Sequence, residues 1–133
     1  DSSLLKKHLV TPTKKKLTPN QLSTGLFAWK VVKHTKSNAI VVAKNNKIIS
    51  ISGGQTSRVD ATKIAFEKTK IPKGCIVASD AFFPFKDSIE KMAQYNIAAI
   101  IQPGGSIRDK EVVESCNKNK IAMAFTGFRV FKH

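Results

Sequence analysis

The sequence has no long apolar run. Its longest apolar stretches are short, such as Ala39–Ala43, whereas a membrane-spanning helix needs about 20 consecutive apolar residues. We therefore expect no membrane segment. No charged region followed by an apolar stretch and a small-residue cleavage site is visible near the start, so we expect no secretion signal. The chain also lacks an initiator Met, and we expect a fragment or a processed product.

Cysteine and histidine are scarce. Cys75 and Cys116 do not form a C-x-x-C and cannot build a disulfide scaffold. Both lie in apolar or helical patterns, where free cysteine behaves as a small buried hydrophobe, and a reducing, cytoplasmic compartment fits best. His8, His34 and His133 have no metal-ligand spacing, and the deaminase pattern H-x-E with P-C-x-x-C is absent, so we expect no zinc.

Acidic residues are few: 9 Asp and Glu face 23 Lys and Arg, which gives a net charge of +14. Such a charge attracts nucleic acid, a membrane surface, or small phosphorylated and carboxylated substrates. The lysines are scattered over the predicted helices and form no aromatic-interleaved stripe, so we expect no nucleic-acid partner. A basic packing module and a nucleic-acid-binding domain, neither catalytic by itself, remain the alternatives to an enzyme.

The length of 133 residues indicates one domain or a large piece of one. Residues 1–16 contain Pro12 and five lysines without a clear apolar period, and we interpret them as a basic arm or linker. The domain itself then spans residues 17–133.

Local signals mark the first elements of this domain. Thr18 and Pro19 form an N-cap followed by proline at the first helical position, which predicts a helix as far as about Lys33. Asn45 and Asn46 tolerate positive φ and predict a tight turn between two strands of a hairpin, which ends near residue 52.

Helices and strands then alternate. The predicted helices are 57–70, 87–95 and 109–120, and the predicted strands are 75–78, 98–102 and 121–125. Short apolar strands that alternate with helices indicate a parallel or mixed sheet covered on both faces. The fold class is therefore α/β.

Two βα junctions share one plan. Gly53-Gly54 and Gly104-Gly105 each precede a serine, Ser57 or Ser106, that has an aspartate three residues later. This is a variant of the capping box. Paired glycines let the backbone approach a ligand, and the helix N-terminus behind them presents free N–H groups. The alternative is that these turns need only glycine and a cap.

Two polar side chains lie near such junctions. Asn38 follows the first helix, and its amide can both donate to and accept from a heterocyclic amide, or simply cap the turn. Arg58 lies just inside a helix N-terminus, where a cation is disfavoured. Its position indicates an anionic partner, and the alternative is an arginine directed to solvent.

The segment Ser79–Asp87 follows a buried strand at its carboxyl end, where open α/β sheets bind ligands. It contains Phe82, Phe83 and Phe85 around a proline. Large apolar rings on a loop either pack at the edge of a core or form the wall of a slot for a flat ring.

Together these motifs resemble the AICAR transformylase/IMP cyclohydrolase family of bifunctional purine biosynthesis enzymes, in its extreme C-terminal part. The similarity runs from about Leu17 to His133. The segments that carry it are Trp29–Lys33, Lys36–Ile40, Gly53–Val59, Ser79–Phe85, Ile101–Asp109 and Phe131–His133.

This resemblance implies transfer of a formyl group from 10-formyltetrahydrofolate to the 5-amino group of AICAR ribonucleotide. The parent enzyme would be a cytoplasmic homodimer whose IMP cyclohydrolase domain is absent here. The fold implied is the second of two cytidine-deaminase-like α/β/α subdomains with a mixed sheet. The rest of the enzyme and a second subunit would be its partners, and the isolated chain would be inactive.

The resemblance also implies roles for individual residues. Catalysis would involve His133 and Asn38. AICAR would contact Arg58, Phe82 and Arg129, the last at its 5′-phosphate. The folate pocket would be lined by Pro84, Phe85 and Asp87. Ser37 and Asp80 resemble positions that coordinate a structural potassium ion in some members.

Two departures from the family pattern stand out. The catalytic Lys-His pair of the family belongs to the preceding subdomain, and Lys33-His34 only imitates it on a predicted helix. In addition, Ser52-Gly53-Gly54 replaces the Gly-Ala-Gly that is common in relatives before the glutamine.

Overall fold

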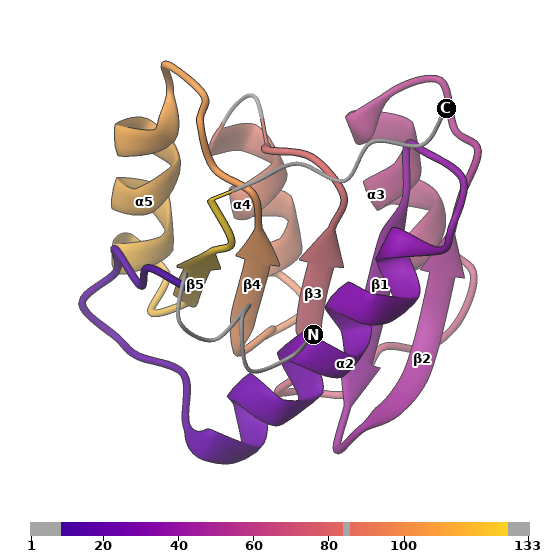
Figure 1. Ribbon diagram of the computed structural model, residues 1–133, viewed down its shortest axis with the longest axis horizontal. Coiled ribbons are helices and arrows are strands. Elements are labelled where there is room, and N and C mark those ends of the chain that lie inside the picture. The colour runs from indigo at the N-terminus through magenta and orange to yellow at the C-terminus, as the bar shows by residue number, and fades with distance from the viewer. Residues whose placement is uncertain (1–8, 84–85, 128–133) are drawn as a thin grey trace.

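The computed structural model describes residues 9–83 and 86–127. Its strands are β1 (Ile40–Lys44), β2 (Lys47–Ser52), β3 (Ile76–Ser79), β4 (Ala99–Gln102) and β5 (Ala122–Phe125); its helices are α2 (Pro19–Lys33), α3 (Arg58–Glu67), α4 (Lys86–Ala93) and α5 (Asp109–Lys118). The strands form one mixed sheet in the order β2-β1-β3-β4-β5 (Figure 1). β1 is antiparallel to both of its neighbours, and β3, β4 and β5 are parallel to one another. The carboxyl ends of β2, β3, β4 and β5 therefore lie along one side of the sheet, which is called the sheet edge below.

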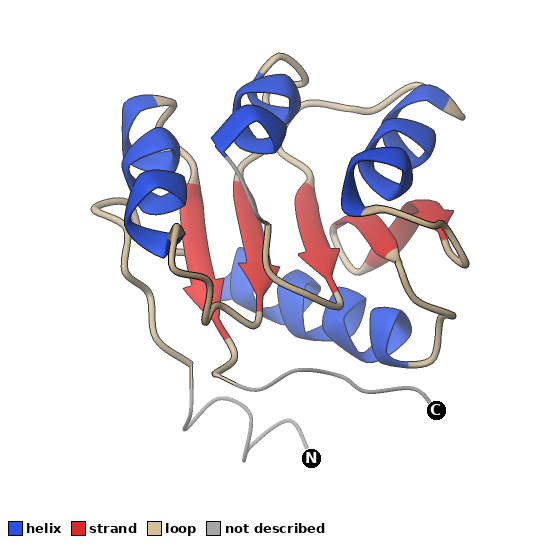
Figure 2. Ribbon diagram, turned by 90° about the horizontal axis from the view of Figure 1, so that it is seen from above, coloured by secondary structure: helices blue, strands red, loops and turns tan. Residues whose placement is uncertain are grey.

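Helices cover both faces of this sheet. The helix α2 lies against one face, and α3, α4 and α5 lie against the other (Figure 2). Side chains alternate along each strand, so Ile40 and Val42 join the core under α3 to α5, whereas Val41 joins the core under α2. The predicted α/β class, with three layers and a mixed sheet, is confirmed.

The local signals act as predicted. The Thr18 hydroxyl accepts a hydrogen bond from the Gln21 N–H at 3.1 Å, and the Gln21 side chain accepts one from the Thr18 N–H at 3.0 Å. This capping box begins α2 at Pro19. Asn45 and Asn46 have φ angles of 50° and 60°, which match the tight hairpin turn between β1 and β2.

Three helices end earlier than predicted, among them α4, which ends at Ala93 and not at residue 95. The helix α3 ends at Glu67, because Pro72 lies close behind it and Ile71 packs against the core. The helix α5 ends at Lys118, and Lys120 adopts a φ of 57°, which turns the chain so that buried Ile121 leads into β5. Among the described helices, none is long and apolar enough to cross a bilayer.

The described part of the basic arm, residues 9–16, lies along the outer edge of β5 (Figure 1). Val10 and Phe125 exchange two backbone hydrogen bonds, of 3.0 and 2.7 Å. Further along, buried Thr13 accepts a hydrogen bond from the Met123 N–H through its hydroxyl at 2.9 Å. The arm thereby satisfies backbone groups that an open sheet edge would present to other chains.

Both cysteines are buried and free. Burial raises the pKa of Cys116 to about 12. It also raises the pKa of Cys75, although nearby Lys44 opposes that shift. A thiol with a raised pKa is a poor nucleophile at neutral pH, so both cysteines are packing residues, as the sequence predicts.

Gly25 lies buried inside α2 and offers a direct stability test. A Cβ at this position would lie 3.6 Å from Ile76 Cγ2 and 3.9 Å from Leu17 Cδ2, which is ordinary contact. We expect Gly25→Ala to raise the free energy of unfolding by about 1 kcal/mol, because glycine disfavours a helix interior. Urea unfolding followed by circular dichroism measures this change. Ala28→Gly in the same helix should act in the opposite direction, and a destabilised Gly25→Ala variant would contradict the expectation.

Candidate active site

Several sequence-predicted residues meet at one sheet edge. β2 and β3 end there, and β1 begins there, because Ile40 pairs with both Ser52 and Ser79. The residues that follow β2 and β3, and those that precede β1, are consequently neighbours in space. Arg58, Asp80 and Asn38 come from these three segments.

Arg58 and Asp80 form a buried ion pair. The Nη1 atom of Arg58 lies 2.8 Å from Oδ1 of Asp80, and the two side chains are 7% and 2% exposed. The same Nη1 donates to the Ala39 carbonyl oxygen at 3.0 Å. The interpretation that Arg58 needs an anionic partner is confirmed, and a solvent-directed arginine is excluded. The anion is supplied by the protein itself.

Asn38 completes this cluster. Its Oδ1 accepts a hydrogen bond from Nη2 of Arg58 at 3.0 Å, and its Nδ2 donates to the Gln55 carbonyl oxygen at 3.1 Å. The backbone N–H of Asn38 donates to the same Gln55 oxygen. The Asn38 amide is therefore fixed in orientation by partners on both sides. The peptide bond between Ser37 and Asn38 is cis.

Asp80 retains one buried oxygen for a further donor or cation. Its Oδ1 contacts Arg58 and accepts from the Ala39 N–H at 3.2 Å, whereas Oδ2 has no hydrogen-bond partner within the described residues. A buried carboxylate oxygen of this kind suits a hard cation. Ser37 is exposed beside the cluster. In the described part of the chain no three His, Cys, Asp or Glu side chains gather into a metal site.

The Phe-rich segment is anchored by its second phenylalanine. Phe83 is fully buried in the core under α3 to α5, and its N–H donates to Oε1 of Gln102 at 2.9 Å. Phe82 is only partly buried. Of the two roles considered for these rings, packing in the core applies to Phe83. Phe82 lies closer to the surface. Pro84 and Phe85 lie outside the described residues.

Gln102 was not predicted from the sequence. It is fully buried at the end of β4, and its Nε2 contacts Sδ of Met123 at 3.2 Å. A glutamine that ends an otherwise apolar strand was the available signal, since a buried amide requires partners. Here it ties the Phe83 backbone to the sheet.

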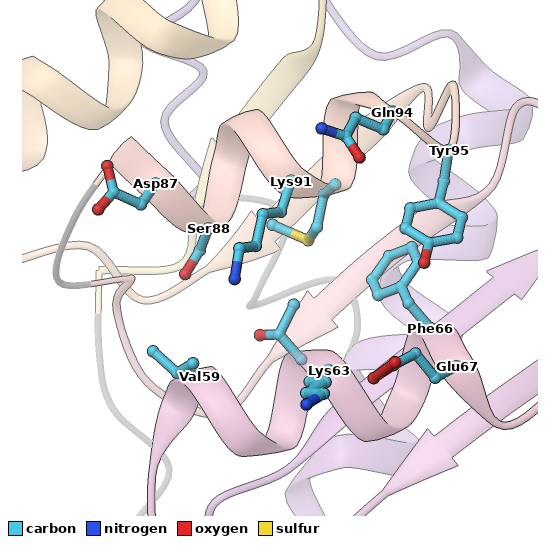
Figure 3. A pocket seen from close by; sticks show the side chains of 11 residues that line it. Val59, Lys63, Phe66, Glu67, Asp87, Ser88, Lys91, Gln94 and Tyr95 are labelled. Carbon is cyan, nitrogen blue, oxygen red and sulfur yellow. The ribbon is translucent and has the colours of Figure 1, made fainter.

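A cavity of about 520 Å³ lies between α3 and α4. Asp87, in the first turn of α4, and Val59, in the first turn of α3, line its end near the sheet edge (Figure 3). Arg58 and Phe82 are not among its lining residues. Within the described residues, the Arg58–Asp80–Asn38 cluster and the cavity therefore meet at the start of α3, where Arg58 of the cluster precedes Val59 of the cavity.

The two Gly-Gly junctions differ in structure. Ser57 caps α3 as predicted and accepts from the Asp60 N–H at 3.1 Å. The second prediction is confirmed only in part, since Arg108, and not Ser106, occupies the N-cap position of α5, and it makes no side-chain capping bond. There the Asp109 carboxylate accepts from the Gly105 and Ser106 N–H groups at 2.8 and 3.2 Å. Because Asp109 occupies these donors itself, this junction does not leave them for an anionic ligand.

The described residues thus bring together Arg58, Asp80 and Asn38, and place Asp87 at the adjacent cavity. Two further predicted residues, Arg129 and His133, lie outside the described residues, as do Pro84 and Phe85. Their assignments stay predictions.

Comparison with known proteins identifies relatives along the whole chain. The model of the family "AICARFT/IMPCHase bienzyme" matches residues 1–68. The chain is 53% identical over 137 residues to bifunctional purine biosynthesis protein PurH of Aquifex aeolicus, covering 100% of the chain and 27% of that protein. It is 59% identical to PurH of Petrotoga mobilis over 81% of the chain and 21% of that protein. For PurH of Acetivibrio thermocellus the identity is 57% over 91% of the chain and 24% of the relative.

The chain thus spans about a quarter of the length of the curated relatives it matches. The family model covers just over half of its residues, which include Asn38 and Arg58 of the buried cluster. On this evidence the chain belongs to the AICARFT/IMPCHase bienzyme family.

Proposed function

We propose that this chain forms one half of an AICAR formyltransferase site, as the second of two similar subdomains in a cytoplasmic, homodimeric protein that also carries IMP cyclohydrolase activity. The observation that carries the proposal is the buried Arg58–Asp80–Asn38 cluster, which lies at the sheet edge beside the Phe-rich segment. The relatives named PurH, at 53–59% identity, support the same assignment.

The proposed reaction moves one formyl group. The 5-amino nitrogen of AICAR ribonucleotide bonds to the formyl carbon of 10-formyltetrahydrofolate, and the bond between that carbon and N10 breaks. The amine loses a proton and N10 gains one, giving formyl-AICAR and tetrahydrofolate. A poorly nucleophilic amine needs a base and stabilisation of the developing oxyanion. We assign a proton-transfer role to His133, which would act together with the Lys-His pair of the preceding subdomain.

The cluster explains how the substrate would be oriented. Within the described residues Arg58 donates two side-chain hydrogen bonds, to Ala39 and Asn38, and pairs with Asp80, so further N–H groups of its five donors remain for a ligand. Asn38 presents an amide that Arg58 and Gln55 hold in place, and such an amide complements the carboxamide of AICAR. Phe82 would pack on the heterocycle, Arg129 would contact the 5′-phosphate, and Pro84, Phe85 and Asp87 would receive the folate.

A structural potassium ion fits part of this site. The unpartnered Oδ2 of Asp80 would hold it together with neutral oxygens, including that of Ser37. The ion would supply a fixed positive charge that stabilises the loop geometry around Asn38.

The decisive experiment replaces the matching segment of Aquifex aeolicus PurH with this chain. We expect the chimaera to form formyl-AICAR only when AICAR ribonucleotide and 10-formyltetrahydrofolate are both present. Asn38→Ala should lower kcat/KM about 100-fold, the effect typical of removing one oriented polar group from an active site. Asn20→Ala on the exposed start of α2 is the control and should leave kcat/KM unchanged.

Two results would contradict the proposal. One is a folded chimaera without formyl transfer. The other is formyl transfer by the purified 133-residue chain alone, because half of the proposed site is missing from it.

A further inference from the structure

The cavity between α3 and α4 is a groove that runs along both helices. On α3 its lining positions include Val59, Lys63 and Phe66, at helical spacings of four and three residues. On α4 they include Asp87 and Lys91, again four residues apart. At 1.5 Å per residue, the ten residues of α3 give the groove a length of about 15 Å. It begins at the sheet edge and leads away from it.

Charge is ordered along this groove. Asp87 lies at the end near the sheet edge and Glu67 at the far end, whereas Lys63 on α3 and Lys91 on α4 lie between them (Figure 3). Neither lysine forms an ion pair with any described residue. A flexible anion that lies midway along the groove would therefore meet two ammonium groups without displacing an existing partner.

The floor of the groove is apolar. Phe66 and Met92 are buried beneath it, and the rings of Phe66 and Tyr95 lie 4.8 Å apart between centroids. Such a surface accepts methylene groups and an aromatic ring. The groove thus suits a chain that combines an aryl group, short methylene segments and carboxylates.

We propose that this groove binds the p-aminobenzoyl-γ-glutamyl tail of the folate co-substrate, with Lys63 and Lys91 pairing with its carboxylates. The inference rests on the proposed function, which places the reactive end of the folate at the Phe-rich segment and Asp87. From there the tail enters the groove between the first turns of α3 and α4. The two lysines then distinguish folates by the charge of the tail.

The test uses the 133-residue chain and the tail alone. Isothermal titration with p-aminobenzoyl-γ-triglutamate gives the affinity, and amide NMR shifts give the location. We expect shifts at Thr62, Ser88 and Gln94, which line the groove. Lys63→Gln or Lys91→Gln should weaken binding about threefold each, and the double variant about tenfold, as expected for partly exposed ion pairs.

The matched control is Lys110→Gln/Lys118→Gln on exposed positions of α5, which removes the same charge at a distance from the groove. It should bind the tail as the unmodified chain does. An affinity that falls equally in both double variants would show a general effect of net charge and overturn the inference. No binding, or NMR shifts confined to another surface, would overturn it as well.

These outcomes separate the inference from the proposed function. If the PurH chimaera transfers formyl groups and tail binding ignores Lys63 and Lys91, only the groove assignment is wrong. If tail binding depends on both lysines and the folded chimaera transfers no formyl group, the formyltransferase proposal is wrong and the groove stands as a site for an aryl oligocarboxylate.

Discussion

Asp80→Ala is expected to lower the free energy of unfolding by about 3–5 kcal/mol, the range seen when one partner of a buried ion pair is removed. The substitution leaves the Arg58 guanidinium, 7% exposed, without its anion. It also removes the acceptor of the Ala39 N–H, which is buried at the start of β1. Urea unfolding of the purified chain, followed by circular dichroism, gives the difference in free energy.

The chain contains its own control for this prediction. Arg108 and Glu111 form an ion pair at 3.2 Å, but their side chains are 49% and 35% exposed. Solvent screens such a pair, so Glu111→Ala should change the free energy of unfolding by less than about 1 kcal/mol. Comparable losses for Asp80→Ala and Glu111→Ala would refute the view that burial makes the Arg58–Asp80 pair important.

Two further variants separate charge from packing. Asp80→Asn retains an oxygen at the carboxylate position and should be less destabilising than Asp80→Ala. The double variant Arg58→Met/Asp80→Leu removes both charges and replaces them with apolar groups of similar size. It should recover much of the stability lost in Asp80→Ala, because apolar replacements of buried ion pairs are often close to neutral. Formyl transfer by the chimaera should not recover with it.

The fold was largely predictable because its signals are local. The cap at Thr18 and the two asparagines of the hairpin each act within four residues, and both have the predicted structure. Helix ends depend on tertiary contacts. The sequence pattern of α3 continues to residue 70, but the helix stops at Glu67, where Ile71 must reach the core and Pro72 follows.

The candidate site was only partly predictable, for the same reason. The position of Arg58 at a helix N-terminus indicated an anionic partner, yet nothing in the sequence near Arg58 identifies Asp80 on another loop. Gln102 contacts Phe83 across two strand ends, and that pairing requires the sheet order. The sequence around Ser106 resembles that around Ser57, but in the structure the Asp109 carboxylate accepts hydrogen bonds from the Gly105 and Ser106 N–H groups. Local sequence patterns predict which residues make such contacts, but the fold topology decides which residues become their partners.

Gly104→Ala is expected to lower the free energy of unfolding by about 3 kcal/mol. Gly104 has a φ of 76°, a conformation that costs an alanine about 1–2 kcal/mol. A Cβ there would also lie 2.9 Å from Cγ and 3.0 Å from Cδ2 of the Phe125 ring, which is too close for either atom. Overpacking of this kind adds about 1–3 kcal/mol.

Gly105→Ala isolates the backbone contribution, because its φ is 95° and a Cβ added there would meet no atom of a non-adjacent residue within 4 Å. It should be destabilised by backbone strain alone, about 1–2 kcal/mol. Phe125→Leu should partly rescue Gly104→Ala and leave the effect of Gly105→Ala unchanged, since contacting residues couple and separated ones add. If Gly104→Ala and Gly105→Ala unfold at the same urea concentration, the Phe125 ring yields freely. In that case β5 does not hold Phe125 firmly against the β4–α5 junction.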